Sequence, residues 1–135
     1  MESETKVAVV VREDLQVWQK MNVTAFTIGG IAGIPGLLGK PYEDKDGRTY
    51  LPMLRQPVLV FAAPKEKMRR TYERALVQEV AFSIYTEELF ATSNDEDNRA
   101  EVIKTASADL DLVGLALFGD RKAVDHVVKG LKLHS

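Results

Sequence analysis

Four stretches of this chain are dominated by hydrophobic side chains, with no regular alternation of polar residues along them. They cover residues 6–11, 58–62, 80–85 and 110–118. Continuous runs of β-branched, aliphatic and aromatic residues are typical of strands that are covered on both faces. The first run contains four valines. It predicts a central strand of a parallel or mixed sheet.

A different spacing of hydrophobic residues follows the first stretch. Between residues 17 and 31, apolar side chains recur every three or four positions, which predicts a helix with one buried face. The positions on that face are Val17, Met21, Thr24 or Ala25, Ile28 and Ile31. We expect Asp14 to cap the start of this helix, and Gly29 and Gly30 to lie where it ends.

Three further helices are predicted by similar patterns, one after each later strand. Ser93 and Glu96 have the spacing of a capping box, for a helix that runs to about residue 106. Asp120 starts the last helix, whose apolar face extends to Leu131. The alternation of strands and helices predicts a single α/β domain over residues 1–135, with a four-stranded mixed or mostly parallel sheet flanked by helices.

Residues 42–54 interrupt this alternation. Asp46 and Gly47 lie between β-forming neighbours and predict a tight hairpin or a surface loop. Apolar and aromatic side chains gather in the same segment. We therefore expect an exposed patch here through which the protein forms a homodimer, since symmetric dimers are the commonest soluble oligomers.

The length, composition and net charge of the chain restrict the classes of function that the protein can have. A chain of 135 residues buries enough surface to fold as one domain without a disulfide or a metal. The absence of cysteine excludes disulfide frameworks, zinc ribbons and thiol nucleophiles. A formal net charge of −2 disfavours a tRNA partner, because nucleic-acid binding proteins usually carry a basic surface. No run approaches the roughly 20 residues of a membrane span, so we expect no membrane partner and a cytoplasmic location.

Polar and charged residues follow the first and third predicted strands. In open α/β sheets, ligands bind outside the carboxyl ends of the strands. If these two strands are neighbours, the expected ligand-binding residues are Arg12, Asp14, Asn22, Thr86 and Glu88. An equally good interpretation of Arg12 and Asp14 is a structural clamp between loops.

Lys20 and Glu87 are the candidate catalytic residues. Lys20 or Asn22 would polarise a carbonyl group, while Glu87 or Glu88 would steer a water molecule. A solvated lysine and a solvated pair of adjacent acids are the simpler interpretations of the same residues.

The sequence predicts no cofactor and no metal site. The glycines between residues 29 and 39 close a helix, whereas a dinucleotide-binding fingerprint opens one directly after a strand. His126 and His134 lie on or after the last helix and, apart from Asp125, have no acidic neighbours at the spacing of metal ligands. We interpret both histidines as surface or packing residues.

Three segments resemble the second type of peptidyl-tRNA hydrolase. Residues 7–26 look like its first strand, which ends in Val-Val-Arg-x-Asp-Leu, and the helix that follows. Residues 57–76 are similar to its second strand and next helix, and residues 112–134 to its last strand and helix, including the Gly-x-Leu-Lys-Leu ending. The resemblance implies the fold of that hydrolase.

A closer match, nearly end to end, is a family of small proteins of unknown function that are thought to share this fold. Its hallmark segments resemble residues 18–26, 55–58 and 85–90.

The hydrolase cleaves the ester that joins a peptide to tRNA, and its motifs differ from this chain at the reactive positions. Its Gly-Lys-x-Ala-Ala-Gln motif is replaced by residues 20–26, KMNVTAF, in which Lys20 matches the functional lysine only in a shifted register. Its Asp-Ala-Gly-x-Thr-Gln motif is replaced by residues 86–89, TEEL. We therefore predict a protein on this scaffold that binds a small polar or anionic ligand without cleaving peptidyl-tRNA. A related ester hydrolase is the alternative.

Overall fold

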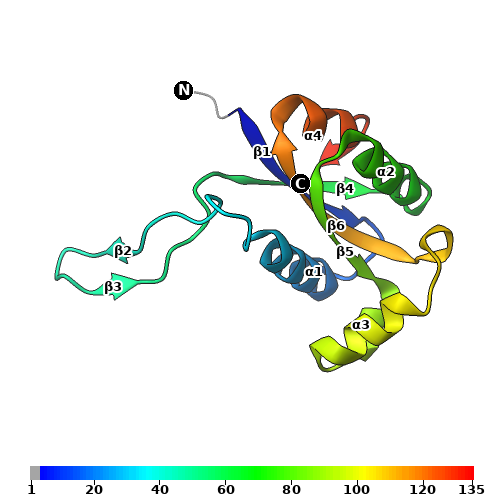
Figure 1. Cartoon of the computed structure of the whole chain (residues 1–135), viewed down its shortest axis with the longest axis horizontal. Coiled ribbons are helices and arrows are strands. Elements are labelled where there is room, and N and C mark those ends of the chain that lie inside the picture. The colour runs from blue at the N-terminus through cyan, green and yellow to red at the C-terminus, as the bar shows by residue number, and fades with distance from the viewer. Residues whose placement is uncertain (1–3) are drawn as a thin grey trace.

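A sheet of five strands forms the centre of the protein, with helices on both faces (Figure 1). The computed structural model describes residues 4–135, so residues 1–3 of the expected domain lie outside the described residues. In spatial order the strands are β5 (Ala81–Thr86), β6 (Leu112–Asp120), β1 (Thr5–Arg12), β4 (Val58–Ala63) and β7 (Lys132–Leu133). The central position predicted for the first strand is confirmed.

The directions of the strands make the sheet mixed. β1 and β4 are parallel, whereas β1 with β6, β5 with β6, and β4 with β7 are antiparallel. The α/β class and the mixed sheet are therefore confirmed, but four strands and a mostly parallel order are wrong. The fifth strand, β7, has two residues, too few to produce a periodic pattern, and follows a turn at Gly130, whose φ of +85° suits glycine.

Two helical layers bury the sheet from opposite sides. Helix α1 (Val17–Ile31) covers one face, and α2 (Lys65–Gln78) and α4 (Arg121–Val127) cover the other. Ala8 and Val10 of β1 pack in the core beneath α2 and α4, while Val7, Val9 and Val11 pack in the core beneath α1. Because both faces of β1 are covered, its sequence needs no polar alternation.

The predicted inner face of helix α1 is correct at its end, where Ile31 is buried and Ile28 packs against the core, and wrong at its start. Its buried residues are Val23, Thr27 and Ile31, whereas Val17 and Met21 of the predicted inner face are 73% and 68% exposed. Thr27 is tolerated inside because its hydroxyl donates to the carbonyl oxygen of Val23, 2.7 Å away. The helix therefore packs on β5 and β6 through smaller side chains and leaves large apolar ones outside.

Two glycines allow this close approach of helix and sheet. A Cβ at Gly114 of β6 would lie 2.1 Å from Cγ1 of Val23. A Cβ at Gly30 of α1 would lie 2.8 Å from Cβ of Ser83 on β5. Both separations are shorter than side chains allow, so backbone packing, rather than the apolar stripe of the sequence, decides which face of α1 is inside.

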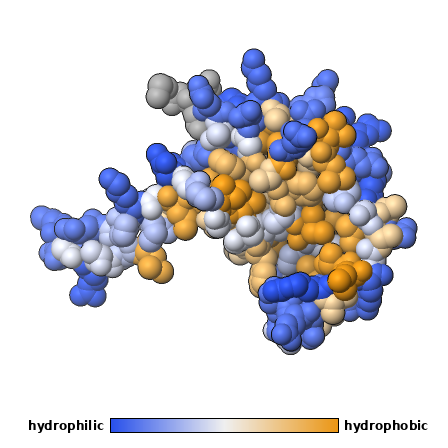
Figure 2. Space-filling view, viewed as in Figure 1, coloured by the Kyte–Doolittle hydropathy of each residue, from blue (hydrophilic) through white to orange (hydrophobic). Residues whose placement is uncertain are grey.

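The segment after α1 forms an arm that projects away from the sheet (Figure 1). Its two short strands are β2 (Tyr42–Glu43) and β3 (Thr49–Tyr50). A bridge between Leu38 and Leu54 closes the base of the arm. Figure 2 shows a mostly hydrophilic tip and hydrophobic atoms nearer the body. The predicted hairpin is confirmed, and Gly47 occupies its turn with a φ of +83°.

Three further helical segments connect the later strands, and the longest of them, like α4, ends earlier than predicted. They are the 3₁₀ turns η1 (Glu87–Ala91) and η2 (Ser107–Asp109), and α3 (Asp95–Ile103). The predicted capping residue of α3, Ser93, is wrong by one position, because the side chain of Asn94 accepts a hydrogen bond from the amide of Asp97. Helix α4 ends at Val127, and the predicted continuation to Leu131 is taken up by the turn into β7.

Candidate functional site

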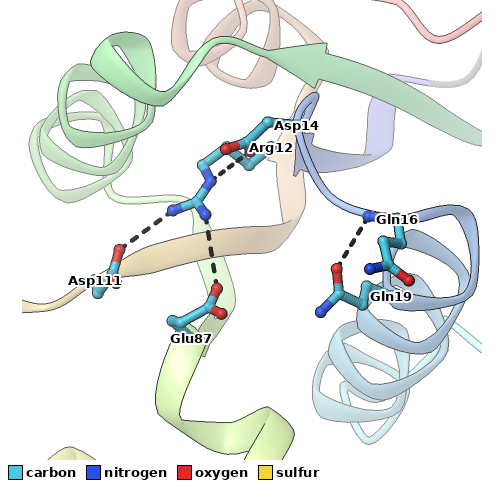
Figure 3. A network of polar contacts seen from close by, with 6 residues as sticks. All are labelled: Arg12, Asp14, Gln16, Gln19, Glu87 and Asp111. Carbon is cyan, nitrogen blue, oxygen red and sulfur yellow. Dashed lines mark hydrogen bonds and ion pairs between the residues drawn. The ribbon is translucent and has the colours of Figure 1, made fainter.

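Arg12 lies at the end of β1 and is surrounded by three carboxylates (Figure 3). Its Nε donates to Oδ1 of Asp14 over 2.7 Å, its Nη1 to Oδ1 of Asp111 over 3.2 Å, and its Nη2 lies 3.6 Å from Oε2 of Glu87. Burial of the guanidinium lowers the pKa of Arg12. The hydrogen bond to Asp14 and the charges of Asp14, Asp111 and Glu87 outweigh that effect and raise the pKa above its ordinary value. Arg12 is therefore permanently charged and fully engaged.

This cluster has the geometry of a structural clamp. It joins the end of β1, the start of η1 and the residue before β6, so three loops share one guanidinium. One cation among three acids has no positive charge left for an anionic ligand. The prediction that Asp14 caps α1 is wrong: the cap is Gln16, whose amide donates to Oε1 of Gln19 over 2.9 Å (Figure 3).

The other predicted residues near this clamp do not form one site with it. Thr86 is buried, and its hydroxyl has no hydrogen-bond partner among residues 4–135. Glu88 is exposed to solvent. Lys20 and Asn22 are on α1 and line two different cavities. Thus the structure brings together Arg12, Asp14 and Glu87, and separates them from Lys20 and Asn22.

Lys20 lines the larger cavity, a cleft of about 600 Å³ that we call the basic cleft. The charged and imidazole side chains that line it are Glu13, Lys20, Lys67, Lys132 and His134. Among residues 4–135, no ion pair engages any of the three lysines. The lining therefore has three cations and one acid, an excess that favours an anionic ligand.

Lys20 and His134 are in direct contact in the basic cleft. Nζ of Lys20 lies 3.0 Å from Nε2 of His134, and Nδ1 of the same ring lies 2.8 Å from the carbonyl oxygen of Ser135. In the tautomer with its proton on Nδ1, the ring donates to Ser135 and Nε2 accepts from the ammonium. The amide of His134 donates to the carbonyl oxygen of Val60, which fixes the residue beside β4.

No local signal in the sequence pairs Lys20 with a residue 114 positions away. The contact depends on the short pairing of β7 with β4, which the sequence pattern did not predict. The interpretation of His134 as a simple surface residue therefore omits its contact with Lys20.

Asn22 lines a second cavity of about 360 Å³, which we call the aromatic pocket. Its Nδ2 donates to the hydroxyl of Tyr85 over 3.1 Å. The aromatic rings that line the pocket belong to Trp18, Phe26, Tyr85 and Phe90. A spacing of four between Trp18, Asn22 and Phe26 is the sequence signal that could have located it.

The comparisons with known proteins place the chain in a family. Residues 5–135 match the family model described as a protein of unknown function, DUF2000. The chain belongs to this DUF2000 family. It is also similar to a solved structure of Atu0240, a protein of unknown function from Agrobacterium tumefaciens strain C58, with 42% identity over 99% of this chain and 100% of that one, and a TM-score of 0.93. A comparison with curated proteins finds no match.

The resemblance to a family of unknown function is therefore confirmed, and these comparisons give no evidence for the resemblance to peptidyl-tRNA hydrolase. In this DUF2000 protein, no group of three or more His, Cys, Asp or Glu residues within residues 4–135 has the geometry of a metal site. Across the same residues, no helix is long and apolar enough to cross a membrane.

The basic cleft and the aromatic pocket thus lie on different sides of α1 and have opposite character. The basic cleft offers ammonium groups, which bind phosphate or carboxylate oxygens. The aromatic pocket offers ring faces and amides, and its single acid, Asp95, is already paired with Arg99.

Proposed function

We propose that this protein binds a small anionic ligand in the basic cleft, on a scaffold like that of the second type of peptidyl-tRNA hydrolase, without cleaving peptidyl-tRNA. The observation that carries the proposal is a cavity of about 600 Å³ with three lysines that no acid in residues 4–135 neutralises. Cavities of about 300–1,000 Å³ are typical of sites for small molecules.

The basic cleft has the donors that an anion requires. Lys20 enters from α1, Lys67 from the start of α2 and Lys132 from β7, so the three charges approach from separate elements. Lys67 already reaches the carbonyl oxygen of Gly130 over 3.5 Å, a weak bond that an anionic ligand would replace. Glu13 lies on the rim and would repel a ligand placed on its side.

The scaffold proposal is supported by the first strand and its exit. Arg12 and Asp14 of the Val-Val-Arg-x-Asp-Leu segment are hydrogen-bonded to each other, and Leu15 is buried behind them. These contacts support a structural role of the segment at the start of α1. The altered motif residues at 20–26 and 86–89 argue against tRNA cleavage.

Titration with inorganic phosphate and citrate, followed by calorimetry, tests the proposal. Lys20→Ala should weaken binding roughly tenfold or more, because a hydrogen bond to a charged group contributes about 1.5–3 kcal/mol. Lys122→Ala, an exposed lysine of α4 outside the cleft, is the matched control and should leave the affinity unchanged. Equal loss in both variants, or no binding at millimolar anion, would refute the proposal.

The contact between Lys20 and His134 favours a second candidate, ester hydrolysis. An ester bound in the cleft would place its carbonyl oxygen on the Lys20 ammonium, and Nε2 of His134 would take a proton from water once a substrate displaces that ammonium. Glu87 stays in the clamp on Arg12. A panel of small esters and peptidyl-tRNA separates the candidates: turnover that is lost in both Lys20→Ala and His134→Ala would establish the hydrolase, and turnover of peptidyl-tRNA itself would refute the primary proposal.

We also propose that the protein forms a homodimer in which the arm of one copy packs on the outer face of α1 of the second copy. Leu51 on the arm is 86% exposed, although the arm is ordered by its own hydrogen bonds. The outer face of α1 carries Val17 and Met21 beside a groove of about 560 Å³. Lys20 and His134 of the basic cleft also line this groove, so an arm seated there would border the proposed anion site. Each copy thus supplies both an apolar projection and an apolar groove, which is the requirement for a closed symmetric pair.

A further inference from the structure

The aromatic pocket is built on one side of α1 from residues spaced four apart. Trp18, Asn22 and Phe26 lie one above another on the helix, and the two rings flank the amide. Trp18 and Phe26 are 56% and 58% exposed. Both rings line the pocket while more than half of each side chain stays exposed.

The rings opposite α1 hold these two in place. Phe90 of η1 meets Trp18 edge-to-face, with centroids 5.8 Å apart, and Tyr85 of β5 meets Phe26 in the same way at 6.0 Å. Tyr85 and Phe90 contact each other at 5.0 Å. Such pairs favour defined ring orientations, so the pocket walls are ordered before any ligand arrives.

Two amides on the walls each have an unused polar atom. Asn22 uses its Nδ2 on the hydroxyl of Tyr85, and Asn98 uses its Oδ1 to accept from the hydroxyl of Thr92. Within residues 4–135, no hydrogen bond engages Oδ1 of Asn22 or Nδ2 of Asn98. One wall therefore offers an acceptor and another offers donors.

The pocket carries almost no charge. Burial raises the pKa of Tyr85 more than its hydrogen bond with Asn22 lowers it, so the phenol stays neutral at physiological pH. The one acid on the rim, Asp95, is paired with Arg99. A phosphate or carboxylate would find no cation here, and an ammonium would find no unpaired acid.

We propose that the aromatic pocket binds a planar, uncharged nitrogen heterocycle of the size of a nucleobase. One of its faces stacks on Trp18, and its edge donates to Oδ1 of Asn22 and accepts from Nδ2 of Asn98. Aromatic stacking contributes about 1–3 kcal/mol per base, and paired donor and acceptor groups on asparagine discriminate between ring edges. This site is separate from the basic cleft, because Lys20 projects from the other side of α1.

Trp18 is the only tryptophan of the chain, so its fluorescence reports directly on the pocket. The probes are adenine and cytosine, with naphthalene as a ring without a polar edge and choline as a compact cation. We expect both bases to shift the emission of Trp18 saturably, with an affinity at least tenfold higher than that of naphthalene or choline. Asn22→Ala should weaken adenine binding about 5- to 30-fold, and Gln78→Ala, at the end of α2 away from the pocket, should not change it.

Several results would overturn the proposal. They are no change in Trp18 emission with millimolar bases, naphthalene binding as tightly as adenine, or choline binding more tightly than either. If Asn22→Ala disturbs folding, Asn98→Ala provides the second test, because Asn98 lies on α3 and its loss leaves α1 intact. Unchanged adenine affinity in a folded Asn98→Ala protein would refute the role of the amides.

Discussion

Replacement of Gly114 by alanine tests how closely α1 must lie on the sheet. The new Cβ would be 2.1 Å from Cγ1 of Val23, against about 3.5–4.0 Å for an ordinary carbon contact, and 3.4 Å from the carbonyl oxygen of Val10. Val23 is fully buried, so it has no space into which to move. Either α1 lifts or Val23 leaves its preferred rotamer, and overpacking of this kind costs about 1–3 kcal/mol.

Alanine also lowers the conformational entropy of the unfolded chain relative to glycine, and this effect would offset only about 0.4–1 kcal/mol of that cost. We therefore expect urea denaturation to show a free energy of unfolding about 1–2 kcal/mol lower for Gly114→Ala, with an unchanged m-value. Gly29→Ala is the control, because a Cβ there has no atom within 4 Å and alanine favours helix, so this variant should be about 0.5–1 kcal/mol more stable.

A double-mutant cycle identifies the cause. Val23→Ala removes the methyl group that blocks the new Cβ, at a cost of about 2 kcal/mol for two buried methyl groups and the space they leave. In the double variant the alanine at position 114 partly fills that space, so the two costs should be non-additive by about 1 kcal/mol or more. Additive costs, or a Gly114→Ala protein within about 0.5 kcal/mol of wild type, would refute the close-packing argument.

Three further predictions concern the clamp, the arm and the dimer. Arg12→Met should lower the free energy of unfolding by about 2 kcal/mol in urea denaturation, because it leaves three half-exposed carboxylates without their cation; a loss under about 0.5 kcal/mol would contradict the clamp. The hydroxyl of Tyr50 donates to Asp44 and lowers the pKa of that carboxyl, so the bond stabilises the arm at pH values above the ordinary Asp pKa, and this stabilisation is lost as the pH falls through the lowered pKa. Tyr50→Phe should return the Asp44 pKa toward normal in an NMR titration, and an unchanged pKa would argue against the bond. Leu51→Glu should convert a dimer to a monomer in light scattering at micromolar concentration while the equally exposed Ile103→Glu does not, and a wild-type monomer would rule out the arm contact.

The sequence predicted the sheet well because its strands are buried on both faces. Residues 6–11 cannot form any surface element, and the strand found at Thr5–Arg12 extends them by one residue at each end. The prediction failed where a strand is defined by its hydrogen bonds to a neighbouring strand and is too short to show a periodic pattern in the sequence. The edge strand β7 is two residues long, and its position beside β4 is visible only in three dimensions.

The candidate site was predicted less completely, for a related reason. The sequence predicted that the ends of these strands meet, and Arg12, Asp14 and Glu87 are together as expected. The single positive charge of Arg12 is already shared among carboxylates in a clamp. The basic cleft depends on three distant elements, which no single-sequence spacing connects. Asn22 was among the predicted site residues, but no role in a site was predicted for the aromatic rings beside it.

Helix α1 leaves several large apolar side chains exposed, and this arrangement has a thermodynamic consequence. It buries Val23, Thr27 and Ile31, while Val17, Trp18 and Phe26 remain largely in water. Folding alone therefore gains little from these large side chains, since apolar area stabilises only when it leaves water. The heterocyclic ligand in the aromatic pocket, or the arm of a second copy on the outer face, would cover these side chains. Either one would bind only the folded chain. Such binding stabilises by about 2.7 kcal/mol at a ligand concentration 100 times Kd. The melting temperature should therefore rise with protein concentration, because dimers form on the outer face, and with heterocycle concentration, because the ligand fills the pocket. The two increases in melting temperature should add, since the two surfaces lie on opposite sides of one helix.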